Sequence, residues 1–371
     1  MQFPLAVAGV LLVPTLVLSL LRAGWLWLRG REQAPLWRRA AWLQPLLFAL
    51  HLFVTFPLLL GWFGSRGVGT RGDERDYQGP RIAADGSWQL QNRDTLRAER
   101  EQPPDPAVVA SARALAVEIP GADGMRLRAF RVPAPGEPVA VCVLVHGLFR
   151  SALELEAPAS MLRRAGCECW LLEQRNHGGS GRAPATFGLR ESADLLAAVR
   201  FVRGQQQREL PLLLYGVSLG TVSVALALPQ LDRVAGVVLD APVDDLAATA
   251  HRMLGLVRPG DRRGFFAMIE PWRSLTVLAL QLWSGFRLDE VRPAAALQGL
   301  SANLPMLLIG GEHDDKVPAA SVQALFDSLP MPTGTKELWL VTDAGHGDAF
   351  ARQPDAYALH LRAFVRRATA P

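Results

Sequence analysis

The pattern of apolar and charged positions divides the chain into an apolar N-terminal part and a mixed remainder. Residues 1–21 and residues 40–65 contain no Asp, Glu, Lys or Arg. A helix needs about 20 apolar residues to cross the hydrocarbon core of a bilayer, and a core helix of a globular domain is rarely apolar all round for that length. Tryptophans gather near the ends of both stretches, as in the aromatic belts of membrane proteins. The pattern therefore predicts two transmembrane helices, arranged as a hairpin, within residues 1–65.

A cleaved signal peptide is the alternative interpretation of the first stretch. It is disfavoured because residues 1–21 have no basic n-region and no small-x-small cleavage site follows them. Five arginines lie between the two stretches and four follow the second, between residues 66 and 81. The positive-inside rule therefore places the loop between the spans in the cytoplasm. We expect a membrane protein, in a bacterial inner membrane, whose C-terminal domain faces the extracytoplasmic side.

Residues 66–110 are rich in Gly, Arg, Asp, Gln and Pro and show no sustained period. The run Pro103-Pro104-Asp105-Pro106 breaks a helix at that point, because proline lacks the N–H that a helix interior needs. The sequence predicts a linker here, either a stalk or an irregular segment that wraps around the following domain.

From residue 111 to residue 371, short apolar runs alternate with stretches of helical character. The first two runs are joined through Gly121–Gly124, which predicts a hairpin. The apolar runs are Val117–Pro120, Leu127–Val132, Val139–Val145, Cys169–Leu172, Leu212–Tyr215, Val234–Leu239, Met306–Ile309 and Leu338–Val341. The helical stretches are about 153–165, 190–204, 219–228, 319–329 and 355–367. Continuous apolar runs are typical of parallel strands buried on both faces, so the alternation predicts a doubly wound, mostly parallel α/β sheet.

One stretch, at about 242–300, interrupts this alternation because it contains no strand pattern. An insertion at this point would lie over the carboxyl ends of the strands, where ligands bind in open α/β sheets. We therefore expect a small helical cap with an apolar stripe at helical spacing. The candidate substrate-pocket residues are Trp272, Trp283 and Phe286 from this stripe, together with Phe149; the alternative is that the stripe forms only the core of the cap.

Composition excludes some classes of function. The formal net charge is +4, only two basic residues are lysines, and the arginines are scattered without interleaved aromatics, so nucleic acid is not an expected partner. The three cysteines lie in or beside apolar runs and do not form a disulfide framework. A lone Cys-x-Cys does not supply the four ligands of a zinc site. We expect buried thiols, no metal and no cofactor.

The run Gly216-Val217-Ser218-Leu219-Gly220 lies between a predicted strand and a predicted helix. A sharp strand-to-helix turn crowds the backbone on both sides of its central residue, and glycine at 216 and 220 removes the side chains that would collide there. Such a nucleophile elbow holds a serine hydroxyl above the sheet. Ser218 is therefore the candidate nucleophile, and an ordinary glycine-rich turn is the alternative.

A serine hydroxyl needs a base, and the base needs an acid that fixes its tautomer. His346 follows the last predicted strand, and Asp314 follows the strand before it. The order Ser, Asp, His along the chain is the one expected for this architecture. Asp315 and Asp240 are the alternative acids. His51 and His360 fit the base less well, because one lies in a predicted span and the other in the last helix.

A tetrahedral intermediate also needs backbone N–H donors for its oxyanion. One donor is expected from Leu219, the residue after the nucleophile. The other is expected from Leu148, in the turn His146-Gly147-Leu148-Phe149 that follows a buried strand. His146 itself is interpreted as a residue that shapes this loop.

These residues together resemble the α/β-hydrolase superfamily. The resemblance is carried by Val145-His146-Gly147, by Gln174–Gly181, by Gly216–Gly220, by Gly311–Pro318 and by Gly345-His346, in that order over residues 111–371. Within the superfamily the chain resembles the serine aminopeptidase (S33-like) and ABHD-type membrane-anchored hydrolases. The resemblance implies Ser218 as nucleophile, Asp314 as acid, His346 as base, and Leu148 with Leu219 as oxyanion donors. Glu173 departs from the aspartate that is usual before the Arg-x-His-Gly-x-Ser-Gly run, at a structural position.

We therefore predict a membrane-anchored serine hydrolase that cleaves a carboxylic ester through an acyl-enzyme. The expected substrate is a small-molecule or lipid ester, and membrane lipid is the other expected partner. A serine peptidase or amidase, or an acyltransferase, uses the same constellation, so the motif does not separate them. A non-catalytic membrane scaffold is the alternative from a different class. The sequence does not determine the oligomeric state.

Overall fold

The computed structural model describes residues 46, 48–255 and 270–370. It consists of two compact units, one formed by Met1–Gly67 and Ala250–Phe286 and the other by Val68–Thr249 and Arg287–Pro371. Each unit is treated below by itself. The first predicted span, residues 1–21, lies outside the described residues, so the predicted hairpin stays a prediction.

The described part of the first unit includes α3 (Phe56–Gly67), which follows the π-helical turn η1 (His51–Thr55), and α11 (Trp272–Ser284). The helices approach closely at Gly61, where an added Cβ would lie 2.6 Å from the Cβ of Ala279. Within the described residues, one helix, Phe48–Glu74, is long and apolar enough to cross a membrane, by length and composition. This helix overlaps the second predicted span.

An eight-stranded sheet forms the centre of the second unit, in the order β10-β9-β8-β7-β5-β6-β4-β3. Its strands are β3 (Ala116–Pro120), β4 (Arg126–Val132), β5 (Ala140–Val145), β6 (Cys167–Glu173), β7 (Leu212–Val217), β8 (Val234–Asp240), β9 (Met306–Gly311) and β10 (Lys336–Val341). The pairs of β4 with β3 and with β6 are antiparallel, and all other pairs are parallel. The predicted mostly parallel sheet is confirmed, and so is the predicted hairpin formed by β3 and β4.

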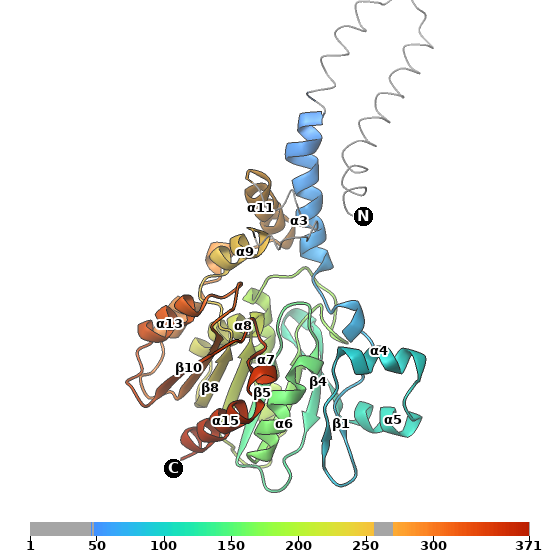
Figure 1. Cartoon of the computed structure of the whole chain (residues 1–371), viewed down its shortest axis with the longest axis vertical. Helices are drawn as coiled ribbons and strands as arrows, with labels where there is room; N and C mark the ends of the chain where they lie inside the picture. Colours follow the sequence, from blue (N-terminus) through green and yellow to red (C-terminus); the bar gives the residue numbers. More distant parts are fainter. Residues whose placement is uncertain (1–45, 47, 256–269, 371) are drawn as a thin grey trace, which may run out of the picture. The chain divides into compact units, whose positions relative to one another are not determined.

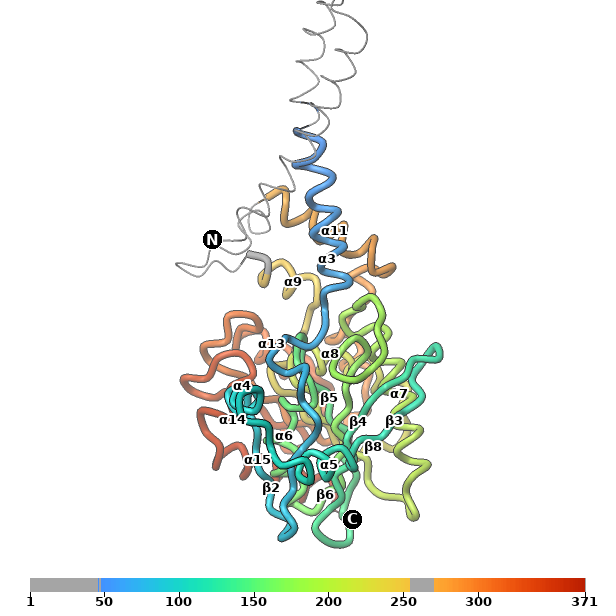
Figure 2. The backbone as a smooth tube through the Cα atoms, turned by 90° about the vertical axis from the view of Figure 1, so that its right-hand side faces the viewer, coloured from blue at the N-terminus to red at the C-terminus, as the bar shows by residue number. Residues whose placement is uncertain are grey.

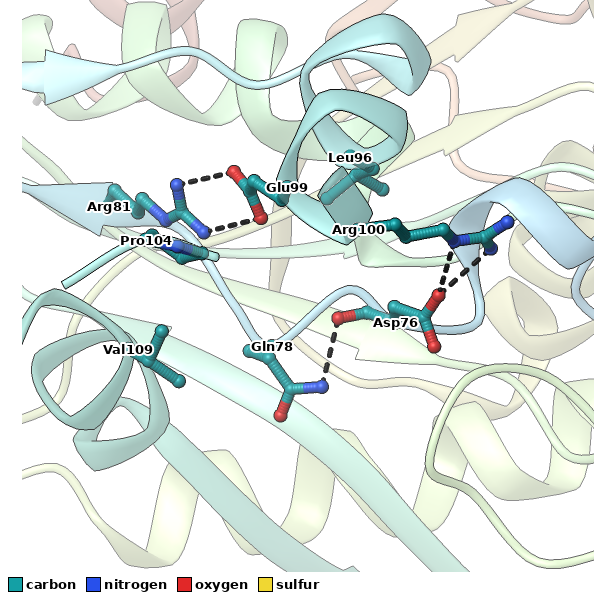
Figure 3. Close-up of a pocket in the computed structure, with 8 residues that line it drawn as sticks. All are labelled: Asp76, Gln78, Arg81, Leu96, Glu99, Arg100, Pro104 and Val109. Atoms are coloured by element: carbon teal, nitrogen blue, oxygen red, sulfur yellow. Dashed lines mark hydrogen bonds and ion pairs between the residues drawn. The ribbon is translucent and has the colours of Figure 1, made fainter. Parts of the chain in front are cut away.

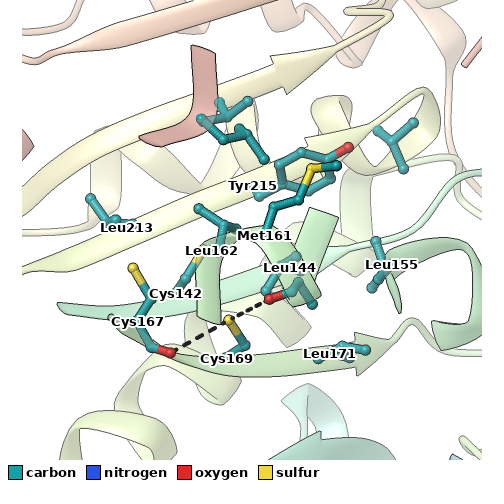
Figure 4. Close-up of a cluster of buried hydrophobic side chains, with 14 of the residues drawn as sticks. Cys142, Leu144, Leu155, Met161, Leu162, Cys167, Cys169, Leu171, Leu213 and Tyr215 are labelled. Carbon is teal, nitrogen blue, oxygen red and sulfur yellow. Dashed lines mark hydrogen bonds between the residues drawn. The ribbon is translucent and has the colours of Figure 1, made fainter. Parts of the chain in front are cut away.

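The central strands are buried on both faces, which explains their continuous apolar runs. The side chains of β5 alternate between the two faces, and Cys142 and Leu144 join one apolar core with residues of the helices that cover that face. Figure 4 shows part of this core, including all three cysteines. Cys142, Cys167 and Cys169 are free and buried, as predicted.

Helices cover both faces of the sheet. The helices of the second unit that alternate with the strands are α6 (Glu156–Arg164), α7 (Leu189–Gly204), α8 (Leu219–Ala227), α13 (Ala319–Ser328), α14 (Ala349–Arg352) and α15 (Pro354–Ala368), with short 3-10 turns at η3 (Ala122–Gly124), η4 (Ala152–Leu155) and η5 (Leu228–Gln230). In Figures 1 and 2, α6 and α15 lie on one side of the sheet and α7 and α8 on the other. Each predicted helix of this alternation is present.

The segment predicted as a linker, 66–110, has regular structure in the second unit. It contains η2 (Gly72–Glu74), the strands β1 (Arg81–Ile82) and β2 (Trp88–Gln89), and the helices α4 (Arg93–Glu101) and α5 (Pro106–Ala114). Tyr77 is fully buried, and its hydroxyl donates to Glu156 Oε1 at 2.9 Å. These elements leave no periodic pattern in the sequence, because the two helices are short and each strand of the hairpin has only two residues.

Between β8 and β9, the described residues are helical and contain no strand. They form α9 (Leu246–Gly255), α11, the turn η6 (Leu288–Glu290) and α12 (Pro293–Gln298). This agrees with the helical character predicted for the insertion at 242–300. Its place over the carboxyl ends of the strands stays a prediction.

Candidate active site

Ser218 lies at the turn between β7 and α8, at the carboxyl edge of the sheet. Its backbone is strained, with φ 51° and ψ −119°, a conformation that persists only when the surroundings hold it. The Ser218 N–H donates to the carbonyl of Asp240 at 2.8 Å. An added Cβ at Gly216 would lie 2.7 Å from the Gly220 carbonyl oxygen, and one at Gly220 would collide with the Val145 carbonyl oxygen. Both glycines are therefore required by close backbone approach, as the motif predicts.

The structure brings three predicted side chains into one hydrogen-bonded chain. Ser218 Oγ lies 2.7 Å from His346 Nε2, and His346 Nδ1 lies 2.8 Å from Asp314 Oδ2. His346 comes from the loop after β10, and Asp314 from the loop after β9. The other Asp314 oxygen accepts the backbone N–H groups of Lys316 and Val317 at 2.8 and 2.9 Å. These bonds fix the carboxylate, so that it can orient the imidazole ring.

The two alternative acids are not bonded to His346. Asp315 is exposed, whereas the Asp314 side chain is only 1% exposed. Asp240 is buried, and its Oδ2 accepts the hydroxyl groups of Tyr357 at 2.7 Å and Tyr215 at 3.4 Å. Burial raises the pKa of Asp240 to about 6, against the opposing effect of the Tyr357 hydrogen bond.

The candidate oxyanion donors belong to adjacent turns. β5 and β7 are paired in parallel, with Val145 opposite Gly216, so the turns that follow them meet at one edge of the sheet. An added Cβ at Gly147 would lie 3.2 Å from the Ser218 Cβ. Within the described part of the chain, the N–H groups of Leu148 and Leu219 donate no hydrogen bond. Two free donors at this edge are what an oxyanion requires.

Two buried histidines shape the loop that carries Leu148. The His146 ring accepts the N–H of Gln174 at Nε2 (3.1 Å), and its Nδ1 lies 2.7 Å from the Gly147 carbonyl. His177 accepts the N–H of Phe149 at Nε2, at 3.2 Å. Burial lowers the pKa of both rings to about 4. Both histidines are therefore neutral near pH 7 and act as hydrogen-bonding supports of the loop.

The candidate pocket residues fall into different units. Phe149 belongs to the second unit, has a left-handed backbone (φ 63°) and carries the Arg71 guanidinium 5.3 Å from its ring centroid. Trp272, Trp283 and Phe286 belong to the first unit. In the same unit, the indole N–H of Trp272 donates to the carbonyl of Leu52 and that of Trp283 to the carbonyl of Leu58, both at 3.0 Å. Their role as a substrate pocket stays a prediction.

Sequence reasoning missed two carboxylates next to the site. Glu154 Oε2 accepts the Gly147 N–H at 2.6 Å, and Glu74 accepts the N–H of Ser151 at 3.0 Å. Neither glutamate belongs to a motif, so no local signal could have identified them. Both act on the loop that includes Leu148.

A separate hollow of about 220 Å³ lies in the N-terminal segment of the second unit. Figure 3 shows its lining, in which Arg81 pairs with Glu99 and Arg100 with Asp76. The charged groups of this hollow neutralise one another, and none of the candidate site residues lines it. Among the residues that the structure describes, no group of three or more His, Cys, Asp or Glu side chains could hold a metal ion.

Solved structures of other proteins share this fold. The esterase Pf2001 of Pyrococcus furiosus is 21% identical, and the match covers 68% of this chain and 90% of that chain with a TM-score of 0.55. Est1E of Butyrivibrio proteoclasticus, solved with ferulic acid bound, is 18% identical over 69% of this chain and 100% of that chain, with a TM-score of 0.54. At these identities the likeness shows the fold alone.

The sequence comparisons agree with the structural ones. The uncharacterized protein YqkD of Bacillus subtilis (strain 168) is 22% identical over 251 residues, which are 67% of this chain and 77% of that protein. Residues 142–359, more than half of the chain, match the model of the alpha/beta hydrolase family. This range contains the elbow at Ser218 together with Asp314 and His346. The chain therefore belongs to the alpha/beta hydrolase family.

Proposed function

We propose that this protein is a membrane-tethered serine hydrolase that cleaves carboxylic esters. The observation that carries the proposal is the chain of hydrogen bonds from Ser218 through His346 to Asp314, at distances of 2.7 and 2.8 Å. A hydroxyl within hydrogen-bond reach of a base, itself oriented by a carboxylate, is the arrangement that activates a serine. The fold likeness to esterases supports the choice of an ester as substrate.

In the first half of the reaction, Ser218 Oγ attacks the ester carbonyl carbon while His346 Nε2 takes the hydroxyl proton. Asp314 stabilises the resulting imidazolium through Nδ1. The N–H groups of Leu148 and Leu219 donate to the carbonyl oxygen as it becomes negative. The carbon–oxygen bond to the alcohol then breaks, the alcohol leaves with the proton from His346, and the acyl group remains on Ser218.

In the second half, water attacks the acyl carbon while His346 takes one of its protons. The bond between the acyl carbon and Ser218 Oγ breaks, and the proton returns to the serine. The products are one acid and one alcohol for each ester cleaved. No residue outside this set is needed to move a proton.

A fluorophosphonate probe tests the nucleophile. The full chain in native membranes or detergent should be labelled, and Ser218→Ala should not be, whereas the control Ser65→Ala should be labelled as wild type is. Ser65 is a suitable control because, among the residues that the structure describes, its hydroxyl bonds only to the Trp62 carbonyl in α3. Labelling that persists in Ser218→Ala would refute the proposal. Parallel rates on matched ester and amide substrates distinguish the esterase from a peptidase or amidase.

We further propose that the tether is a membrane helix and that the substrate is an apolar or lipid ester. The helix Phe48–Glu74 supports the tether, as does the resemblance to membrane-anchored S33-like and ABHD-type hydrolases. Carbonate washing of membranes should leave the full chain in the pellet, and its release would contradict the tether. In a panel of p-nitrophenyl esters, kcat/KM should rise with acyl length, and a preference for acetate would contradict the apolar substrate.

The arginine balance of the sequence favours an extracytoplasmic catalytic domain, and we propose this orientation. Reporter fusions at the C-terminus test it. Alkaline phosphatase, which folds in the periplasm, should be active there, and green fluorescent protein exported unfolded should not fluoresce. The opposite pattern would place the domain in the cytoplasm.

A further inference from the structure

The segment that follows α3, residues 68–77, contacts the loop that carries Leu148. The backbone N–H of Arg71 donates to the carbonyl of Phe149 at 3.0 Å, and the hydroxyl of Thr70 donates to the carbonyl of Arg150 at 3.0 Å. Two consecutive carbonyls, immediately after Leu148, are therefore bonded by this segment. Residues 68–77 and the loop that carries Leu148 both belong to the second unit of the structure.

Glu74 makes the most extensive of these contacts. Its carboxylate is 2% exposed, and one oxygen accepts both the N–H and the hydroxyl of Ser151 at 3.0 Å. The other oxygen accepts from Arg150 at 2.9 Å and from Arg93 at 3.0 Å. A buried carboxylate with four charge-assisted or backbone donors is held firmly, and it holds the donors in turn.

The opposite end of the loop is held by Glu154. This residue accepts the N–H of Gly147 at 2.6 Å and pairs with Arg150 at 2.9 Å. Arg150 therefore bridges Glu74 and Glu154, and Leu148 lies between the two anchored ends.

Between these anchors, Phe149 has a strained left-handed backbone with φ 63°. Its N–H donates to His177 and its carbonyl accepts from Arg71. A non-glycine residue keeps this conformation only where neighbouring groups enforce it. The direction of the Leu148 N–H, one residue earlier, depends on the same backbone.

We propose that Glu74 is a positioning residue for the oxyanion donor Leu148, acting through the loop Gly147–Ser151. The proposal rests on the proposed function, because it assigns a role in the same site. It means that residues following α3, at the C-terminal end of the candidate membrane helix Phe48–Glu74, are part of the active-site machinery. An oxyanion donor acts in the transition state, so its misplacement lowers kcat while KM changes little.

The test compares Glu74→Gln with Glu99→Gln in the full chain in detergent. Glu99 is a matched control, because it is half-buried in the same N-terminal segment and pairs with Arg81 but contacts nothing in the loop. With p-nitrophenyl butyrate, Glu74→Gln should lower kcat roughly 10- to 100-fold, since a shift of about 1 Å costs up to 10²-fold. KM should stay within about twofold, and Glu99→Gln should match wild type.

A trifluoromethyl ketone provides a readout that a purely structural role would not change. It forms a hemiketal with the nucleophile and places an anionic oxygen at the donors, so its Ki should rise in Glu74→Gln by the same factor as kcat falls. Wild-type kcat and Ki in Glu74→Gln would overturn the proposal, and so would an equal loss in Glu99→Gln.

If Glu74→Gln does not fold, Arg71→Pro compared with Arg71→Ala decides the question. The backbone of Arg71 has φ −63°, which suits proline, so the comparison removes one N–H donor to Phe149 and little else. A lower kcat in the proline variant supports the proposal, and equal kcat values overturn it. The proposed function fails separately, if Ser218→Ala retains esterase activity, and the positioning role then fails with it.

Discussion

The neutral state of His177 leads to a measurable pH dependence of stability. The ring is 3% exposed and accepts the Phe149 N–H at Nε2, so protonation at that nitrogen breaks the bond. Burial, assisted by the neighbouring His146 ring, lowers the pKa of His177 from 6.5 to about 4. Between these values the unfolded chain binds more protons than the folded chain. The free energy of unfolding therefore decreases as the pH falls through this window.

The size of the effect follows from the shift. At about 1.36 kcal/mol per pKa unit, a change of this size lowers the free energy of unfolding by roughly 3 kcal/mol once the pH is below both pKa values. At pH 5, roughly 2 kcal/mol of this loss is already present. Other groups titrate in the same range, because burial raises the pKa values of Asp240 to about 6 and Glu156 to about 7. Their effect has the opposite sign, so the wild-type pH dependence alone is not informative. The comparison must be made with a variant.

The variant is His177→Gln, which keeps a hydrogen-bond acceptor but does not titrate. Urea unfolding of the full chain in one detergent, followed by circular dichroism, gives the free energy of unfolding at pH 7 and pH 5 for each protein. From pH 7 to pH 5, the free energy of unfolding of the wild type should fall by roughly 2 kcal/mol more than that of His177→Gln. His313→Gln is the control, since the side chain of His313 is 68% exposed, and it should follow wild type. Equal losses in wild type and His177→Gln would refute the reasoning.

Three further substitutions test other parts of the argument. Asp314→Asn should lower kcat for ester hydrolysis by roughly 10⁴-fold, because an amide favours the wrong imidazole tautomer; a loss below tenfold would contradict its role. Gly220→Ala should yield little folded protein, since its Cβ collides with backbone, whereas Gly204→Ala, with open space around it, should melt within a few degrees of wild type. Glu173→Gln, which removes a fully buried carboxylate paired with the partly exposed Arg128, should cost about 3 kcal/mol in urea unfolding, against less than about 1 kcal/mol for Glu118→Gln in an exposed pair.

The strands and the elbow could be predicted from sequence because their signals are local. Continuous apolar runs arise wherever a strand is covered on both faces, and the glycines around Ser218 are required by contacts within the turn and with the adjoining strand. The segment 66–110 could not be predicted in the same way. Its helices are short, and the buried Tyr77 has partners far along the chain: its hydroxyl donates to Glu156, 79 residues later, and its ring contacts Phe130.

The choice among candidate acids shows the same limit. Asp314 and Asp315 are adjacent in sequence and have the same side chain, so composition and spacing do not separate them. Two backbone N–H groups and His346 meet Asp314, while Asp315 is exposed. That distinction depends on how the loops after β9 and β10 fold against each other.

By itself, the sequence determined the order of strands and helices along the chain, the candidate nucleophile Ser218, the candidate base His346 and a short list of candidate acids. These features depend on residues close together or on the fixed order of strands in the sheet. The tertiary structure alone decided which carboxylates support the loop of Leu148. Glu74 and Ser151 are 77 residues apart, and no local pattern encodes their contact. A buried charge needs partners wherever the fold places it, so such partners become visible only when the chain is folded.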